Sequence, residues 1–265
     1  MIIDNIVASV ESHRCYSHPV FENWVKNDPS PEVIGALFHQ IQNFCASTRP
    51  GLKLPLGLKN IGLSEESHLL QEIVESEEDH GPELATMAGH ILNRAAGKTI
   101  CSDLYNQVAV ENQLKEYSDR LLGSLPGYDF KIGLMPQTRN AIAVFERRQQ
   151  MDEESIYRNL GTTLALEIIS NRHLIPGEKH CLVDSRLYKT SLAEPEMHYL
   201  LEHYGETGAE AKHEQNAINA VASVLNDINK QSVQAGVNDF LNSLTALWDL
   251  LDSALLESGN IRLAA

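Results

Sequence analysis

Apolar residues recur along this chain at intervals of three and four, which is the spacing of one face of an α-helix. No window shows the sustained alternation of apolar and polar residues that is typical of a half-buried strand. The pattern predicts helices at residues 5–13, 20–26, 32–47, 64–80, 83–96, 102–122, 137–150, 153–173, 197–228 and 232–256. No linker, repeat or low-complexity stretch separates them, so we expect one all-α domain, a helical bundle, over residues 1–265.

Proline and glycine mark several expected boundaries. Pro31 follows Ser30 as a helix start, and Pro82 should kink or split the helical pattern of residues 64–96. Pro176 and Gly177 should end the helix at 153–173. The segment 128–136 is the expected insertion or lid, because it follows Pro126-Gly127 and lacks helical periodicity.

Residues 197–228 carry acids and a histidine on the face that should be buried. At ~100° per residue, Glu206, Glu210 and His213 share one stripe of a helix. The same stripe continues as an apolar face, with Ala217, Val221, Val224 and Ile228. Two carboxylates and an imidazole are therefore expected to face the interior, where charge is costly unless it is paired or bound to a metal.

A second acid and histidine pair lies in the segment VESEEDHGPELATMAGHIL. Glu77 and His80 are three residues apart and so share a helix face. That face continues through apolar residues, namely Leu70, Ile73, Leu84, Met87 and Ile91. Glu83 and His90 form a rival pair that flanks the stripe, and His90 is kept as a second-tier candidate.

A third helix supplies Glu167, which stands in an apolar row in the segment NLGTTLALEIISNRHLIPG. The candidate metal ligands are thus Glu77, His80, Glu167, Glu206, Glu210 and His213. Four carboxylates and two imidazoles from three helices are the ligand set of a carboxylate-bridged dinuclear iron or manganese site. The alternative interpretation is a set of ordinary buried ion pairs.

Composition narrows the class of protein further. The net charge of −15 argues against nucleic acid and anionic membranes as partners. The four cysteines form no CxxC pair, which favours free thiols in a reducing compartment. The first residues lack a basic start followed by a long apolar run, and no stretch approaches 18 apolar residues, so we expect no signal peptide or membrane span and a cytoplasmic protein.

The order of these motifs resembles the heme-oxygenase-like diiron oxidases and oxygenases, in the superfamily of thiaminase-type TenA proteins and pyrroloquinoline-quinone (PqqC-like) synthases. The motifs are ExxH at residues 77–80, LALEIIS around Glu167 and ExxxExxH at residues 206–213. The segments HPVFENW and SPEVIGALFHQIQNF are similar to the first two helices of that superfamily, so the resemblance spans most of the chain. The usual last motif, HxxxDxxH, here has acids in place of its first histidine and its aspartate.

The family also supplies a glutamate from an early helix, and residues 32–47 lack one at the matching place. His39 is the candidate substitute, and His203 is a further candidate ligand or a hydrogen-bond partner of a carboxylate. The departure leaves open whether one metal or two is bound.

The resemblance implies a nonheme iron enzyme, with Fe(II) in one or two sites and Mn as an alternative, that oxidises a small amino-acid-like or fatty-acid-like metabolite with O2. A small-molecule substrate and O2 are the expected partners, and a homodimer is left open. One alternative is a metal-free enzyme of cofactor metabolism that uses Cys45, Cys101 or Cys181 as its nucleophile. Another is a non-enzymatic ligand-binding or heme-binding protein, with His39 as the axial ligand.

Overall fold

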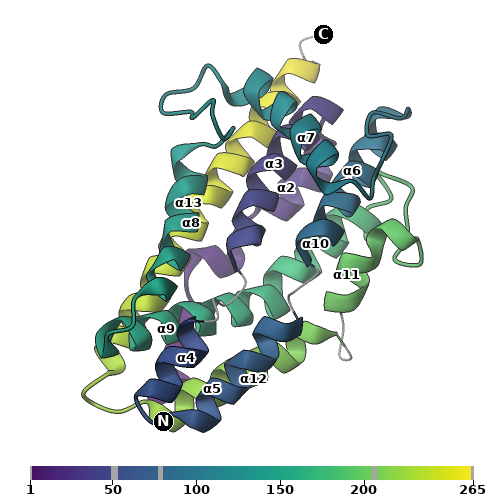
Figure 1. Ribbon diagram of the computed structural model, residues 1–265. Helices are drawn as coiled ribbons and strands as arrows, with labels where there is room; N and C mark the ends of the chain where they lie inside the picture. Colours follow the sequence, from purple (N-terminus) through teal and green to yellow (C-terminus); the bar gives the residue numbers. More distant parts are fainter. Residues whose placement is uncertain (1, 49–52, 77–79, 205–207, 264–265) are drawn as a thin grey trace.

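The structure, a computed structural model, describes residues 2–48, 53–76, 80–204 and 208–263. Within these residues the regular elements are helices, and strand-like pairing is limited to an isolated bridge between Asp129 and Leu134 (Figure 1). The expected all-α fold is confirmed. Its assignment to the heme-oxygenase or TenA-like type, and a single domain over residues 1–265, stay predictions, although the described buried apolar residues form one continuous core.

The α-helices are α1 (Ile2–Glu11), α2 (Val20–Asn27), α3 (Pro31–Thr48), α4 (Lys53–Asn60), α5 (Ser64–Ser76), α6 (His80–Ala96), α7 (Gln107–Leu122), α8 (Pro136–Glu146), α9 (Glu153–Ile169), α10 (Ile175–Lys179), α11 (His198–His203), α12 (Ala209–Val224) and α13 (Lys230–Leu263). Short 3₁₀ turns lie at Arg14–Ser17, Arg147–Gln149 and Pro195–Met197. Two π turns, Ser170–Leu174 and His180–Asp184, flank α10.

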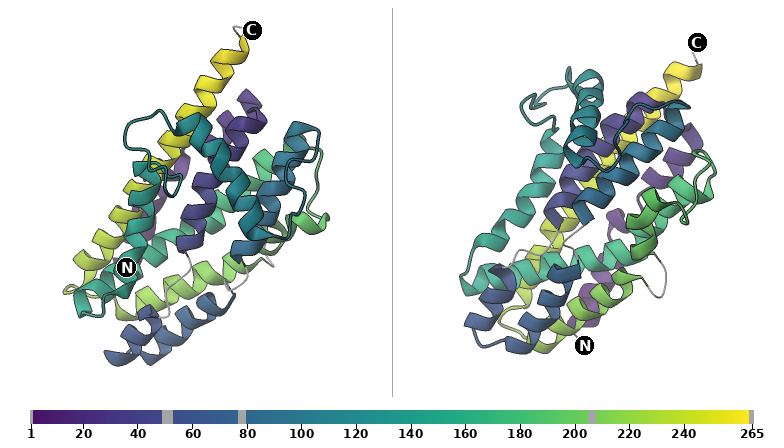
Figure 2. Two further views of the ribbon diagram at one scale, coloured as in Figure 1. Left: turned by 45° about the horizontal axis from the view of Figure 1, so that its top comes forward. Right: turned by 45° about the vertical axis from the view of Figure 1, so that its right-hand side comes forward.

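Helix α9 runs through the middle of the molecule. On one side it packs against α12 and α4, which themselves pack on α5, and on the other side against α13 and α8 (Figures 1 and 2). Every residue of α9 from Asn159 to Ile169 is buried, so the C-terminal two-thirds of this helix has no solvent-facing side. A helix that is enclosed all round is part of the core itself.

The contact between α9 and α13 is made by the backbones of the two helices. A Cβ atom at Gly161 would lie 1.9 Å from the carbonyl oxygen of Val233, and one at Gly236 would lie 1.8 Å from that of Arg158. Neither helix therefore has room for a side chain at this crossing. Thr162 adds a hydrogen bond from its hydroxyl to the carbonyl of Gly236, at 3.3 Å.

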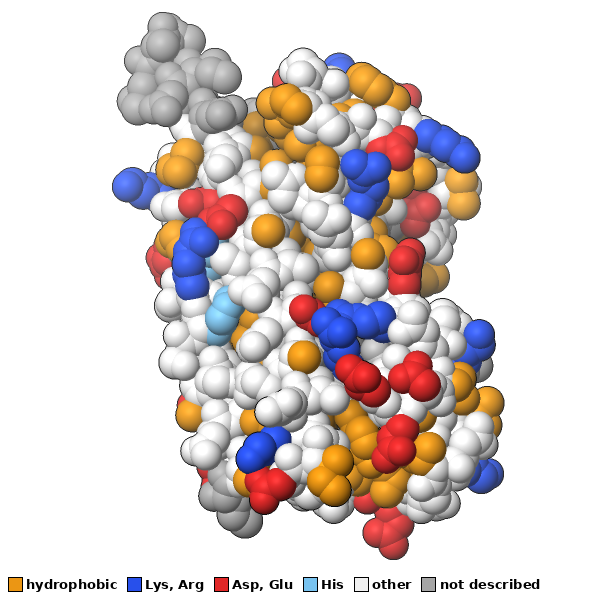
Figure 3. Space-filling view, turned by 90° about the vertical axis from the view of Figure 1, so that its left-hand side faces the viewer, with side chains coloured by type: hydrophobic (Ala, Val, Ile, Leu, Met, Phe, Trp, Pro, Cys, Tyr) orange, Lys and Arg blue, Asp and Glu red, His pale blue; other side chains and the backbone are white. Residues whose placement is uncertain are grey.

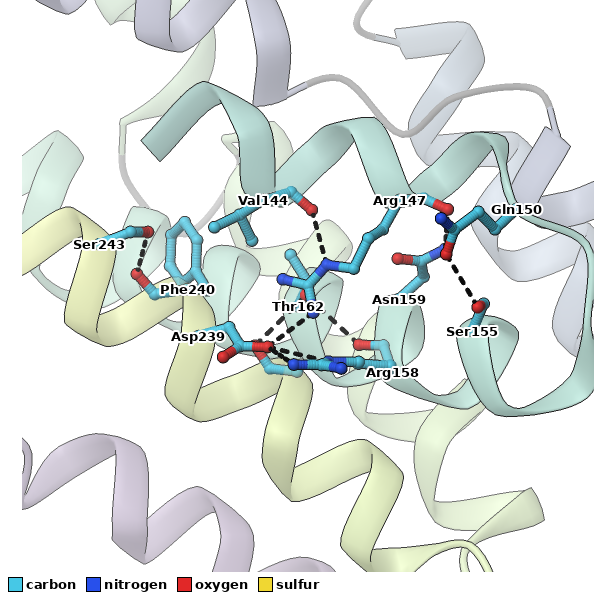
Figure 4. Close-up of polar contacts among 11 residues, drawn as sticks. Val144, Arg147, Gln150, Ser155, Arg158, Asn159, Thr162, Asp239, Phe240 and Ser243 are labelled. Carbon is cyan, nitrogen blue, oxygen red and sulfur yellow. Dashed lines mark hydrogen bonds and ion pairs between the residues drawn. The ribbon is translucent and has the colours of Figure 1, made fainter. Parts of the chain in front are cut away.

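An ion-pair network lies beside this crossing. Asp239 on α13 accepts hydrogen bonds from Arg147, at 2.6 Å, and from Arg158 on α9, at 2.5 Å (Figure 4). All three side chains keep some exposure to solvent, so the network stabilises the fold modestly. Its main effect is to fix α13 in register against α9.

The prediction of one helix over residues 197–228 is wrong. Helix α11 ends where Tyr204 takes an extended backbone conformation, and α12 starts at Ala209 and ends at Val224. Beyond that point the side chain of Asn226 accepts hydrogen bonds from the backbone N–H groups of Ile228 and Asn229, which turns the chain. Ile228 is consequently 93% exposed, whereas the expected inward positions of Ala217, Val221 and Val224 are buried.

The expected stop at Pro176 is also wrong. The chain passes from α9 through the π turn Ser170–Leu174 into α10, with Pro176 in the first turn of that helix. A proline has no N–H group to donate to the carbonyl four residues earlier, so it interrupts the hydrogen bonding of a regular α-helix. Here the residues before Pro176 form a π turn, which has a different hydrogen-bond spacing. Near Pro82, α5 ends at Ser76 and α6 starts at His80, so the proline lies in a first turn.

The segment 128–136 is tied to α3. Gln40 donates a hydrogen bond to the carbonyl of Gly133, at 2.8 Å, and accepts one from the backbone N–H of Met135, at 3.1 Å. His39 donates to the carbonyl of Ile132, at 3.0 Å. The expected lid is therefore anchored on the flank of α3 by side chains that are themselves buried.

The surface on the left-hand side of Figure 1, where α8 and α13 lie, carries acidic and basic side chains interspersed with apolar ones (Figure 3). The net negative charge of the chain is thus not gathered on this face. In the part of the chain that the structure describes, no helix combines the length and the apolar composition needed to cross a bilayer.

We predict that Gly161→Ala and Gly236→Ala each lower the free energy of unfolding by about 2–4 kcal/mol, because the added methyl group meets backbone and the two helices must separate. Urea denaturation followed by circular dichroism measures this. Gly81→Ala in α6 is the control, since its Cβ would meet nothing closer than a side-chain nitrogen at 3.7 Å. Equal stability of all three variants would contradict a backbone contact between α9 and α13.

Candidate metal centre

Glu167, Glu210 and His213 meet in the interior. Each offers one potential ligand atom, and these atoms all lie within 4.8 Å of one another. The three residues are 4%, 5% and 3% exposed, respectively. Glu167 comes from α9, and the other two come from α12, which packs along α9.

The local folding of each helix explains why these side chains face inward. Glu167 stands on the enclosed part of α9, where every direction leads to the core. Glu210 and His213 are three residues apart on α12 and share its buried face with Ala217 and Val221. This is the arrangement that the sequence pattern predicts for these three residues.

His203, on α11, completes the group from a third helix. It is buried, and its Nε2 atom lies 3.7 Å from Oε1 of Glu210. Its Nδ1–H donates a hydrogen bond to the carbonyl of Tyr199, at 2.6 Å. In the neutral ring the lone pair is therefore on Nε2, the nitrogen that faces the carboxylate.

The ring of His213 is oriented in the same way by Ser76, the last residue of α5. The Ser76 hydroxyl donates to the carbonyl of Ile73, at 3.0 Å, so its oxygen accepts from Nε2–H of His213, at 2.7 Å. The lone pair of the neutral ring is then on Nδ1, which lies 3.9 Å from Oε2 of Glu167. In their neutral forms both histidines thus direct a nitrogen lone pair at a carboxylate.

Two acceptors that face each other repel unless a proton or a cation lies between them. Nitrogen and oxygen ligands stand about 2 Å from a divalent transition metal, so two ligands of one ion are about 3–4 Å apart. The separations of 3.7 and 3.9 Å fit ligands of a shared cation. They are too long for direct hydrogen bonds between imidazole and carboxylate.

Glu214, one residue after His213, provides an internal comparison. It is also buried, but it accepts hydrogen bonds from Arg172, at 2.9 Å, and from Asn171, at 2.5 Å. A buried carboxylate with a structural role is satisfied here by a guanidinium and an amide. Glu167 and Glu210 each lie next to an imidazole, in the arrangement in which histidines and carboxylates bind metals.

The remaining predicted ligands are distributed differently. Glu77 and Glu206 lie outside the described residues, and His80 begins α6 with a side chain that is likewise outside them. His39 binds the carbonyl of Ile132, and burial lowers its pKa. His90 contacts Thr190, at 3.0 Å.

His90 belongs to a separate cluster with Glu194 and Glu196, and Glu83 to another with His198 and Glu202. In the first, Arg94 donates to Glu194 at 2.7 Å, so part of the negative charge is already balanced. In the second, the two α11 residues are exposed. Burial and donor orientation therefore favour the centre around Glu167.

Sequence patterns missed several contributors to this centre. Ser76 orients His213, and the ring of Tyr199 stacks on that of His203 with centroids 4.4 Å apart. Tyr199 also lines a cavity next to the centre, together with Cys45, Leu174, Glu167, Glu210 and His203. Of these residues, Ser76 alone could have been suspected from the sequence, because it directly precedes the predicted ligand Glu77.

A second, apolar cavity shares Cys45 and Leu174 with the first and contains one carboxyl group. That group belongs to Glu178 on α10, a residue 6% exposed whose Oε2 makes no hydrogen bond to the described residues. Burial raises the pKa of Glu178 to about 8. The carboxyl is therefore largely neutral at pH 7.

A comparison of this chain with protein-family models, with curated proteins and with solved structures finds no match in any of the three.

The raised pKa of Glu178 predicts how stability depends on pH. Between pH 4.5, its ordinary pKa, and pH 8 the unfolded chain is ionised at this residue while the folded chain keeps the proton, so stability falls as pH rises. The cost is at most about 1.4 kcal/mol per pH unit. Glu178→Gln should therefore be more stable than the wild type at pH 8, with a difference that shrinks toward pH 5.

Denaturation of both proteins between pH 5 and 8 measures this difference. Glu22→Gln is the control, because Glu22 on the neighbouring helix α2 has a side chain that is 79% exposed. A difference between Glu178→Gln and the wild type that does not change with pH would contradict the buried neutral carboxyl.

Proposed function

We propose that this protein is a nonheme iron oxidase or oxygenase that binds Fe(II) through Glu167, Glu210, His213 and His203. The observation that carries the proposal is the convergence of Glu167, Glu210 and His213 at one buried point, with the buried His203 placed 3.7 Å from Glu210. The resemblance of the motifs to the heme-oxygenase-like diiron oxidases supports the same conclusion from the sequence.

The chemistry of the donor set supports the choice of metal. Mixed imidazole and carboxylate ligands suit iron, manganese and zinc, whereas Mg²⁺ and Ca²⁺ prefer all-oxygen sites. Two histidines with carboxylates are typical of ferrous centres that react with O2, which favours iron. The four described ligands suffice for one ion. A second ion would depend on Glu77, His80 and Glu206.

The bound iron would supply the one-electron chemistry that lets O2 react with an organic substrate. The chain's own groups have two tasks. Ser76 and the carbonyl of Tyr199 hold the two imidazoles in the tautomers that bind a metal. Buried Leu166 and Ile175, with the Tyr199 ring, limit the access of water to the cavity. Cys45 and Leu174 separate this polar cavity from the apolar one beside Glu178.

A metal-free enzyme is the second candidate, and one observation selects its nucleophile. Burial raises the pKa of Cys101 and raises that of Cys181 well above its ordinary value, so both thiols are poor nucleophiles. Cys45 is half-buried and lines the cavity next to Glu167 and Glu210. Of the three cysteines, Cys45 is thus the one placed to react.

We predict that the full-length protein binds Fe(II), and the spectroscopic probe Co(II), with a buried histidine and carboxylate environment. Glu167→Gln, Glu210→Gln and His213→Ala should each weaken binding by at least about 100-fold, since loss of an outer partner alone costs about 10–100-fold. Anaerobic titration monitored by Co(II) absorbance measures the affinity, and elemental analysis measures the number of ions.

Glu72→Gln is the matched control, because Glu72 lies on α5 beside α12 and forms a surface pair with Lys212. Saturating metal should raise the melting temperature of the wild type and of this control but not of Glu210→Gln. A wild type that binds no metal, or ligand variants that bind as tightly as the control, would refute the iron proposal. Turnover abolished by Cys45→Ala in metal-free protein would favour the alternative.

Ser76→Ala separates orientation of a ligand from ligation itself. The variant keeps all four ligands but loses the acceptor that holds Nε2–H of His213, so metal affinity should fall by roughly tenfold and not be abolished. The same Co(II) titration measures it, and Ser76→Thr, which restores the hydroxyl, should recover most of the loss. Unchanged affinity in Ser76→Ala would mean that His213 is not a ligand in the proposed tautomer.

A further inference from the structure

The ion pair between Arg172 and Glu214 joins the two helices that supply most of the proposed ligands. Glu214 follows His213 on α12, and Arg172 lies in the π turn Ser170–Leu174, which continues α9 beyond Glu167. The pair therefore connects α9 and α12 close to the residues that a bound metal would connect. Neither of its two members is among the proposed ligands.

The π turn brings two neighbouring side chains to one carboxylate. The backbone N–H of Ile175 donates to the carbonyl of Ser170, five residues earlier, which is one residue more than the spacing of an α-helix. Asn171 donates to Oε2 of Glu214, at 2.5 Å, and Arg172 donates from Nε to Oε1, at 2.9 Å, and also from Nη2. Both carboxylate oxygens of Glu214 are thus bonded to consecutive residues of a π turn, a backbone feature that is frequent at functional sites.

The guanidinium of Arg172 is held in one orientation. Its remaining nitrogen, Nη1, pairs with Glu11 at the end of α1, so all three nitrogens are engaged. The pair with Glu214 is the shielded part of this network, because the Glu214 side chain is 9% exposed whereas that of Glu11 is 45% exposed. A shielded pair made through the planar guanidinium fork is more rigid, and less weakened by salt, than an ordinary surface pair.

The geometry of the candidate centre depends on how α12 lies against α9. Nδ1 of His213, on α12, lies 3.9 Å from Oε2 of Glu167, on α9, and any slide of one helix along the other changes this separation. A functional centre needs its groups within roughly 0.5 Å of the productive geometry. A rigid link between the two helices at this level would therefore control whether the ligands reach one ion.

We propose that Arg172 and Glu214 are positioning residues of the metal centre, whose ion pair fixes α12 against α9 so that Glu210 and His213 reach the same ion as Glu167. The inference rests on the proposed function. Arg172 and Glu214 act through the backbone and do not bind the metal, since both oxygens of Glu214 are taken up by the π turn. An ion pair that only stabilised the fold would change the melting temperature and leave the centre as it is.

Arg172→Met removes the link but keeps the four proposed ligands. Anaerobic titration of the full-length variant with Co(II) should show an affinity roughly tenfold lower than that of the wild type, because loss of a partner outside the ligand set costs about 10–100-fold. The visible absorption of bound Co(II) should change as well, since it reports the arrangement of the ligands. Arg172→Lys, which restores the charge but not the planar fork, should recover part of the lost affinity.

Arg158→Met is the matched control. Arg158 is also on α9 and pairs with Asp239 on α13, but it lies more than two helical turns before Glu167 (Figure 4). Its loss removes an ion pair of the same helix away from the centre, so the affinity and the absorption spectrum of Co(II) should stay those of the wild type.

A readout without metal separates this proposal from the iron proposal. The ¹⁵N NMR signals of the His213 ring, identified by their loss in His213→Ala, should shift or broaden in metal-free Arg172→Met and stay unchanged in Arg158→Met. If these signals respond but the wild type binds no Co(II), the iron proposal fails and the link between α9 and α12 stands. Unchanged signals in Arg172→Met, Co(II) affinity and absorption equal to those of the wild type, or an equal loss of affinity in Arg158→Met would each overturn the positioning role.

Discussion

The backbone contact between α9 and α13 fixes the rest of this structure. Gly161 and Gly236 let the two helices touch without side chains between them, and α9 is buried from Asn159 to Ile169. A helix without a solvent-facing side cannot place any polar side chain in water. The carboxylate of Glu167 must therefore be stabilised by groups inside the protein. The polar residues of α11 and α12 that lie near it provide those groups.

The buried carboxylates of this region have different neighbours, and this difference marks the candidate metal centre. Within a few residues of α12, Glu214 pairs with Arg172, and Glu210 and Glu167 lie 3.7 and 3.9 Å from ring nitrogens of His203 and His213. Replacing those imidazoles by guanidinium groups would balance charge more simply. In the proposed metal centre a cation would stabilise these carboxylates and imidazoles together, which would tie this part of the core to function as well as to folding.

The sequence predicted the helical class and the inward position of Glu167, Glu210 and His213, because a period of 3.6 residues determines which side chains share a helix face. The predicted helix boundaries were wrong where local side-chain hydrogen bonds or a π turn change the course of the backbone. The Asn226 side chain turns the chain after α12, and a π turn carries the helix past Pro176. His203 was only a second-tier candidate, since its role depends on how α11 packs against α12, which a pattern within one helix cannot show.

The burial of Glu178 beside the second cavity also could not be predicted from the pattern of a single helix. Its segment follows an expected helix stop, so nothing in the local pattern marks it as buried, and only the fold brings α10 against the aromatic residues of α2, α3 and α13. The polar cavity around Glu167 and the apolar cavity around Glu178 share Cys45 and Leu174 as a common wall. The two carboxyl groups thus lie on opposite sides of one wall and meet burial differently: Glu167 lies beside the imidazole of His213, whereas burial raises the pKa of Glu178 so that it keeps its proton.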